Sequence, residues 1–98
     1  MPFAIHATEA GMLLELSGGV TVRHAQELSK CVAGRLLSGM NVRVDSRNLE
    51  DIDTSILQML VSLRRMAGTF VVQEASAAFV AAVDRCALRR ALLSKDLL

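Results

Sequence analysis

Residues 45–55 bring together the side chains of this chain that are best suited to chemistry. The segment ends in Asp53-Thr54-Ser55, and an apolar stretch begins directly after it at Ile56. Because Ser, Thr and Asp are preferred where helices begin, we expect a helix to start near Asp53 or Thr54, with the Asp53 side chain accepting from the free N–H groups of its first turn. The positive end of a helix tolerates a phosphate, so Thr54 is a candidate phosphorylation site, and plain helix capping is the simpler alternative. Ser55 is expected to make only a local hydrogen bond.

The aspartates of this segment do not form a pattern typical of a catalytic or metal site. Asp45, Asp51 and Asp53 lack the spacing of a calcium-binding loop, and neither a histidine pair nor a positioned nucleophile accompanies them. Neither His6 nor His24 stands in a Glu-x-x-His or His-x-x-x-His spacing. We therefore expect no enzyme activity, no cofactor and no bound metal, and we expect both histidines at the surface.

Composition indicates one globular domain. The chain has 98 residues, of which 52% are hydrophobic and 3% aromatic, and its 11 Lys+Arg against 10 Asp+Glu give a net charge of +1. This length supports one core but not two, so we expect a single domain over residues 1–98. Near-neutral charge and few aromatic residues argue against a nucleic-acid partner. No apolar run reaches the length of a spanning helix, and the distant Cys31 and Cys86 suggest neither a disulfide nor a zinc site, so we expect a cytoplasmic protein without membrane insertion.

Hydrophobic spacing predicts the element order β-β-α-β-α-β-α. The strands are expected at residues 3–8, 12–17, 42–44 and 69–72, with Gly18-Gly19 closing the second strand and Asp45 leaving the third at its carboxyl end. The helices are expected from Thr21 to an end at Ser38-Gly39, from Asp53 or Thr54 to Met66, and from Ser76 onward with a break near Cys86. This order implies an α/β fold in which a mixed sheet of four or five strands packs with about four helices.

The features in this order resemble the STAS family, the domain shared by anti-sigma-factor antagonists and the cytoplasmic tails of sulfate transporters. The resemblance covers most of the chain and rests on residues 16–21, 42–45, 52–60 and 76–88. In family antagonists a partner anti-sigma kinase phosphorylates the hydroxyl directly after the aspartate, which implies this role for Thr54. The sequence departs from the family at two positions: Ile56 replaces a glycine, and Thr21 stands where an acidic residue often follows the second strand.

These observations together predict a non-enzymatic bacterial signalling or adaptor protein. We expect it to bind a protein partner, namely an anti-sigma kinase, another signalling protein or a transporter subunit. The alternative is a constitutive STAS subunit of a lipid-trafficking ABC transporter or of a chemotaxis-associated complex, and a weak homodimer is left open. A second apolar row on the helix after Thr54 is either part of the docking surface or core against the C-terminal helix. The expected partner-binding residues are Thr21, Asp53, Thr54, Ser55, Ile56 and Met59.

Overall fold

A mixed four-stranded sheet forms the centre of the protein, which the computed structural model describes at residues 3–9, 11–34 and 39–93. The strands are β1 (Phe3–Ala7), β2 (Gly11–Val20), β3 (Asn41–Ile52) and β4 (Thr69–Gln73), in that order across the sheet. β1 is antiparallel to β2, whereas β3 and β4 both run parallel to β2. The predicted fold class and element order are confirmed.

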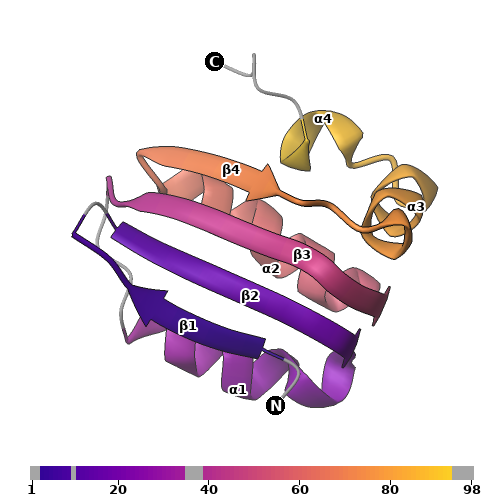
Figure 1. Ribbon diagram of the computed structural model, residues 1–98, viewed down its shortest axis with the longest axis horizontal. Helices are drawn as coiled ribbons and strands as arrows, with labels where there is room; N and C mark the ends of the chain where they lie inside the picture. Colours follow the sequence, from indigo (N-terminus) through magenta and orange to yellow (C-terminus); the bar gives the residue numbers. More distant parts are fainter. Residues whose placement is uncertain (1–2, 10, 35–38, 94–98) are drawn as a thin grey trace.

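Four helices accompany this sheet in the described part of the chain. They are α1 (Val22–Ala33), α2 (Thr54–Met66), α3 (Ala77–Arg85) and the short α4 (Arg89–Leu92). α1 and α2 lie on one face of the sheet, while α3 and α4 lie together on the side where β4 ends (Figure 1). None of the described helices is long and apolar enough to cross a membrane.

The core lies between the sheet and the helices on its covered face. Alternate residues of β2 point into it, so Leu14 and Leu16 are buried while Glu15 between them is exposed. α2 contributes four buried side chains to the same core, and burying each such aliphatic side chain stabilises the fold by about 1.5–3 kcal/mol. These four are Ile56, Leu57, Leu60 and Leu63. The opposite face of the sheet carries exposed polar residues such as Glu15 and Arg43 together with the exposed Val71.

β3 continues far beyond the predicted strand and includes residues that the sequence suggested were a polar loop. Two bulges explain the difference, because the partners of β2 shift register between Glu15 and Ser17 and again between Gly18 and Gly19. Each bulge places one extra residue on β3, so the buried positions after Ser46 come three residues apart, at Leu49 and Ile52, instead of two. That spacing hides the period of two by which a strand is recognised in a sequence.

Glycines at both ends of β2 have local conformations that the strand requires. Gly11 begins β2 with φ +156°, and a Cβ at this position would lie 1.9 Å from the carbonyl oxygen of Asn41 on β3. Gly18 has φ +61° and lies at the second bulge. Gly18 and Gly19 are therefore inside β2, which corrects the expectation that they end it.

Most helix ends lie at or near the residues where the sequence predicted them. α2 ends at Met66, two residues before Gly68, and the break between α3 and α4 falls at Cys86 as expected. Ser76 caps α3, since its Oγ accepts from the backbone N of Phe79 at 3.1 Å. α1 is described to Ala33, with Gly34 as its C-cap. Its expected continuation through residues 35–38 lies outside the described residues.

Candidate functional site

The first turns of α1 and α2 lie next to each other beyond the carboxyl ends of β2 and β3 (Figure 1). Val20 and Ile52, the last residues of the two strands, are register partners. The backbone N–H of Asp53 continues this pairing by donating to the carbonyl of Val20 at 3.1 Å. Helix N-termini carry partial positive charge, and two of them lie side by side at this edge of the molecule.

The side chain of Asp53 bonds to the neighbouring helix. Its Oδ2 accepts from the backbone N of Val22, the first residue of α1, at 2.6 Å, and it makes no cap hydrogen bond to α2. The α2 amides of Ile56 and Leu57 instead bond the backbone carbonyl of Asp53, at 3.0 and 3.2 Å. This corrects the expectation that the Asp53 side chain caps its own helix. Asp53 thus fixes the starts of both helices relative to each other.

Thr54 and Ser55 form the exposed part of the α2 start. The Oγ1 of Thr54 lies 3.5 Å from the Sγ of Cys86, which follows α3. The corner between α3 and α4 therefore reaches the candidate phosphorylation site. Cys86 is partly buried against the core. The contact between Cys86 and Thr54 could not be predicted from the sequence, because the two residues are far apart in the chain and no motif links them.

An ion pair closes the corner that carries Cys86. Arg89 donates from Nε and Nη2 to the two carboxylate oxygens of Asp84, at 2.8 and 2.7 Å. These hydrogen bonds hold the pKa of the Asp84 carboxyl below its usual range and raise the pKa of Arg89. The two residues belong to α3 and α4, so the pair ties these short helices together.

Thr21, which is partly buried, and the exposed Val22 form the start of α1. Thr21 is the N-cap residue, and its backbone N donates to Nδ1 of His24 at 3.1 Å. His24 is only partly exposed and has this local structural role, whereas the sequence suggested a surface histidine. Val22 is 63% exposed, a larger fraction than that of the exposed Met66 and Val71. We call Thr21, Val22, Asp53, Thr54 and Ser55 the helix-start surface.

Two of the expected partner-binding residues lie deeper in the molecule. Ile56 has 0% exposure and is part of the core, so a partner cannot contact it while α2 keeps this position. This corrects the expectation that Ile56 itself lies on the binding surface. Met59 is half-buried and packs against the core cluster. The second apolar row of α2 consists of Ile56, Met59, Leu63 and Met66, and of these only Met66 is mostly exposed, at 52%.

The comparisons with known proteins agree with this architecture. A family model described as "Mlab, STAS domain" matches residues 3–94, which is nearly the whole chain. No curated protein matches the chain. Among the residues that the structure describes, no three His, Cys, Asp or Glu side chains are grouped so that they could hold a metal ion.

Proposed function

The chain belongs to the STAS domain family, and from this premise we propose that it binds a partner protein through the helix-start surface as a non-catalytic signalling or adaptor protein. Family membership supports a role in protein–protein interaction. The observation that carries the proposal is the exposed pair of Thr54 and Val22 on two helix starts that Asp53 holds together. Protein interfaces combine an apolar centre with a polar rim, and the helix-start surface offers Val22 for the first and Thr54 and Ser55 for the second.

Phosphorylation of Thr54 is the switch in this proposal. The hydroxyl is exposed at the first residue of α2, where the side chain of Asp53 makes no cap hydrogen bond to the first turn. A phosphate would add about −1.5 to −2 charge at a helix end that favours negative charge, so the domain would stay folded. The same charge would lie on the surface that includes exposed Val22, which changes the surface that a partner meets. The proposed setting is the bacterial cytoplasm, with an anti-sigma kinase or another signalling protein as partner.

Two observations favour constitutive docking as a second candidate function. Thr54 already has a neighbour in Cys86, and the family glycine is replaced by Ile56, which is buried and anchors the start of α2. A surface fixed in this way suits a permanent subunit of a lipid-trafficking ABC transporter or of a chemotaxis-associated complex. In that case Thr54 has only a structural role.

Partner capture with three baits separates these candidates. Wild-type protein, Thr54→Glu and Ser55→Glu are used in parallel on extract of the source bacterium, and mass spectrometry identifies partners and any phosphate on Thr54. Ser55→Glu is the matched control, because it adds the same charge at the adjacent exposed position. A switch predicts that Thr54→Glu alone changes the set of partners. Equal recovery of the same partner with all baits, and no phosphate on Thr54, favours constitutive docking.

The surface itself is tested by affinity measurements on the purified complex. Val22→Ser removes the exposed apolar side chain of the helix-start surface, and we expect it to weaken partner binding about tenfold or more. Met66→Ser is the control, because it removes a comparably exposed apolar residue at the other end of α2. If both variants bind the partner as tightly as the wild type does, the helix-start surface is not the docking site.

A further inference from the structure

β4 forms one edge of the sheet and has a neighbouring strand on one side only. Within the described part of the chain it pairs with β3, and α3 and α4 lie beyond its carboxyl end (Figure 1). The side that faces β3 is fixed just before the strand begins. There the backbone N of Gly39 donates to the carbonyl of Met66 at 3.1 Å, and that of Gly68 donates to the carbonyl of Met40 at 2.8 Å. Residues 66 and 68 therefore turn these backbone groups toward β3.

The other side of β4 carries backbone groups that have no partner in the described ranges. The backbone groups of successive strand residues point to opposite sides, so Phe70 and Val72 continue the bonding to β3. Thr69, Val71 and Gln73 turn their N–H and C=O groups to the free edge, and no hydrogen bond joins these groups to another described residue. Such a row of unpaired groups is a template for a further strand.

The side chains of β4 leave this edge unprotected. Natural edge strands keep other strands away with charged residues, especially lysine, or with proline. The sequence of β4, Thr-Phe-Val-Val-Gln, contains neither. Val71 at its centre is 44% exposed, on the face of the sheet that α1 and α2 leave uncovered.

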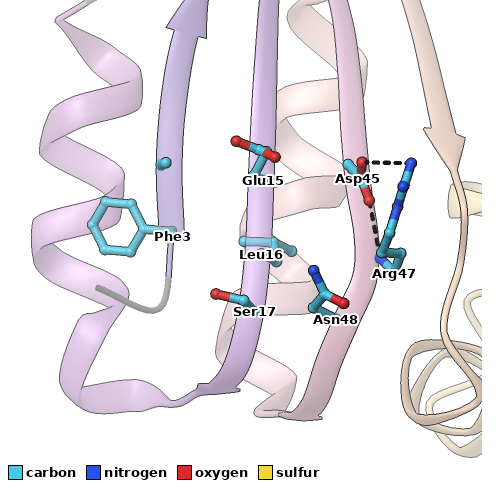
Figure 2. A pocket seen from close by; sticks show the side chains of 8 residues that line it. Phe3, Glu15, Leu16, Ser17, Asp45, Arg47 and Asn48 are labelled. Atoms are coloured by element: carbon cyan, nitrogen blue, oxygen red, sulfur yellow. Dashed lines mark hydrogen bonds and ion pairs between the residues drawn. The ribbon is translucent and has the colours of Figure 1, made fainter.

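The two carboxylates of the uncovered face, by contrast, have partners within the chain. Asp45 accepts from the backbone N of Arg47 at 3.0 Å, and its Oδ2 lies 3.4 Å from Nη2 of the same residue (Figure 2). Glu15 Oε1 contacts Nε2 of His6. The backbone of β4 is therefore the part of this side of the molecule that a further strand would complete.

We propose that β4 pairs with β4 of a second copy of this chain, in the antiparallel direction and about a two-fold axis at Val71. This register places Val71 opposite its own copy, Thr69 opposite Gln73, and Phe70 opposite Val72. Apolar side chains then meet apolar ones and polar side chains meet polar ones, as favourable cross-strand pairs do. The contact uses the same patch on both copies, so it closes at the dimer.

The free backbone groups decide this register. Opposite residues of an antiparallel pair either exchange both of their N–H···O bonds or exchange none. With the axis at Val71, the residues whose groups point outward stand only opposite one another, so all of these groups gain partners. Any other antiparallel register leaves part of this five-residue strand unpaired. A second copy is the occupant because β4 is complementary to itself in both its backbone and its side chains.

The dimer keeps the helix-start surfaces of the two copies apart. β4 lies along the first residues of β3, Asn41 to Asp45, whereas the helix-start surface lies beyond the carboxyl end of that strand. Because the two copies run in opposite directions, their helix-start surfaces lie at opposite ends of the dimer. The proposal therefore goes beyond the proposed function and does not depend on Thr54.

The test measures association of the whole chain and the amides that it protects. Sedimentation velocity from about 20 µM to about 1 mM should show a shift from monomer to dimer and no larger species. Amide hydrogen exchange by NMR is then compared at the two ends of this range. Thr69, Val71 and Gln73 should exchange at least about threefold more slowly at the higher concentration, whereas Phe70 and Val72, which already bond to β3, should change little.

Three variants make the result specific, with circular dichroism to verify that each is folded. Val71→Lys places like charges opposite each other at the axis and should weaken association about tenfold or more. Val71→Thr keeps a β-branched side chain without charge and should associate within about threefold of wild type. Ala4→Lys adds the same charge at an exposed position of β1, the other edge of the sheet, and should associate as the wild type does.

Several outcomes would overturn the proposal. It fails if the chain stays monomeric over the whole concentration range, or if folded Val71→Lys associates as tightly as wild type. It also fails if exchange slows equally along all of β4, because that pattern does not come from pairing at the edge. Association that Ala4→Lys weakens and Val71→Lys does not would assign the contact to β1. Growth beyond the dimer that both lysine variants abolish would indicate pairing of β4 with β1 of the next copy instead.

Discussion

The carboxylate of Asp53 lies 2.6 Å from the backbone N of Val22, so one aspartate begins α2 with its backbone and caps α1 with its side chain. The bond joins residues 31 positions apart in the chain. It is the link that keeps the proposed phosphorylation site on α2 and the exposed apolar residue on α1 in one surface.

Replacing Asp53 by Ala should therefore loosen the start of α1 more than that of α2. Loss of a capping hydrogen bond costs about 1–2 kcal/mol, and we expect this decrease in the free energy of unfolding by urea. Amide hydrogen exchange should accelerate at Val22 before it does in the first turn of α2. Glu50→Ala is the control for loss of a nearby carboxylate. Faster exchange in α2 alone would contradict the cap across the two helices.

The sequence predicted the start of α2 correctly but assigned the Asp53 side chain to the wrong helix. The start was predictable because Asp53 and Thr54 are adjacent helix-start residues before an apolar run, which is a local pattern. The bond to Val22 depends on how β2 and β3 align. Two bulges set that alignment, and the sequence signal for them is the unusual spacing of Ser46, Leu49 and Ile52.

The exposure of the site residues also could not be predicted from local sequence patterns. Ile56 and Met59 both lie on α2 at positions that the sequence placed on the binding surface, yet Ile56 is fully buried and Met59 half-buried. The α2 start contacts segments from elsewhere in the chain, at Val22 of α1 and at Cys86 after α3. Only the tertiary packing decides which apolar face of a helix stays exposed.

Gly11→Ala should destabilise the protein by about 2–4 kcal/mol, because the added Cβ would meet the Asn41 carbonyl and the backbone has positive φ. Chemical unfolding measures the change. Gly19→Ala is a matched control in the same strand, since a Cβ there has no atom within 4 Å. We expect that control to stay within about 0.5 kcal/mol of wild type. Equal stability of the two variants would show that β2 and β3 do not approach so closely at Gly11.

Ile56→Ala should cost about 2–5 kcal/mol in the free energy of unfolding, since it leaves a cavity in the core at the start of α2. Met66→Ala, at an exposed position of the same helix, should cost less than about 1 kcal/mol. The milder Ile56→Val should lower stability while leaving partner affinity unchanged. A large loss of affinity in folded Ile56→Val would instead place this residue in the binding surface.

The ion pair between Asp84 and Arg89 should make the α3–α4 corner sensitive to acid. Its hydrogen bonds lower the pKa of Asp84 below the ordinary value of 3.8, so the pair stabilises the folded state above that pH. This contribution disappears as the pH falls through the lowered pKa of the folded state. Thermal melting from neutral pH to about pH 2 should show a steeper acid loss in wild type than in Asp84→Asn. Glu50→Gln should follow the wild-type curve, and parallel curves for all three proteins would exclude the effect.

The two bulges of β3 have a consequence for how the length of this strand can change in evolution. Each extra residue exchanges the inward and outward faces of the residues that follow, and the second exchange restores the original assignment at Ile52. Loss of a single residue would turn apolar side chains to solvent or move Asp53 away from Val22. Loss of one residue from each bulge would leave both the faces and the helix starts in place. Related chains should therefore tolerate insertions and deletions in β3 as compensating pairs, and single ones should be selected against.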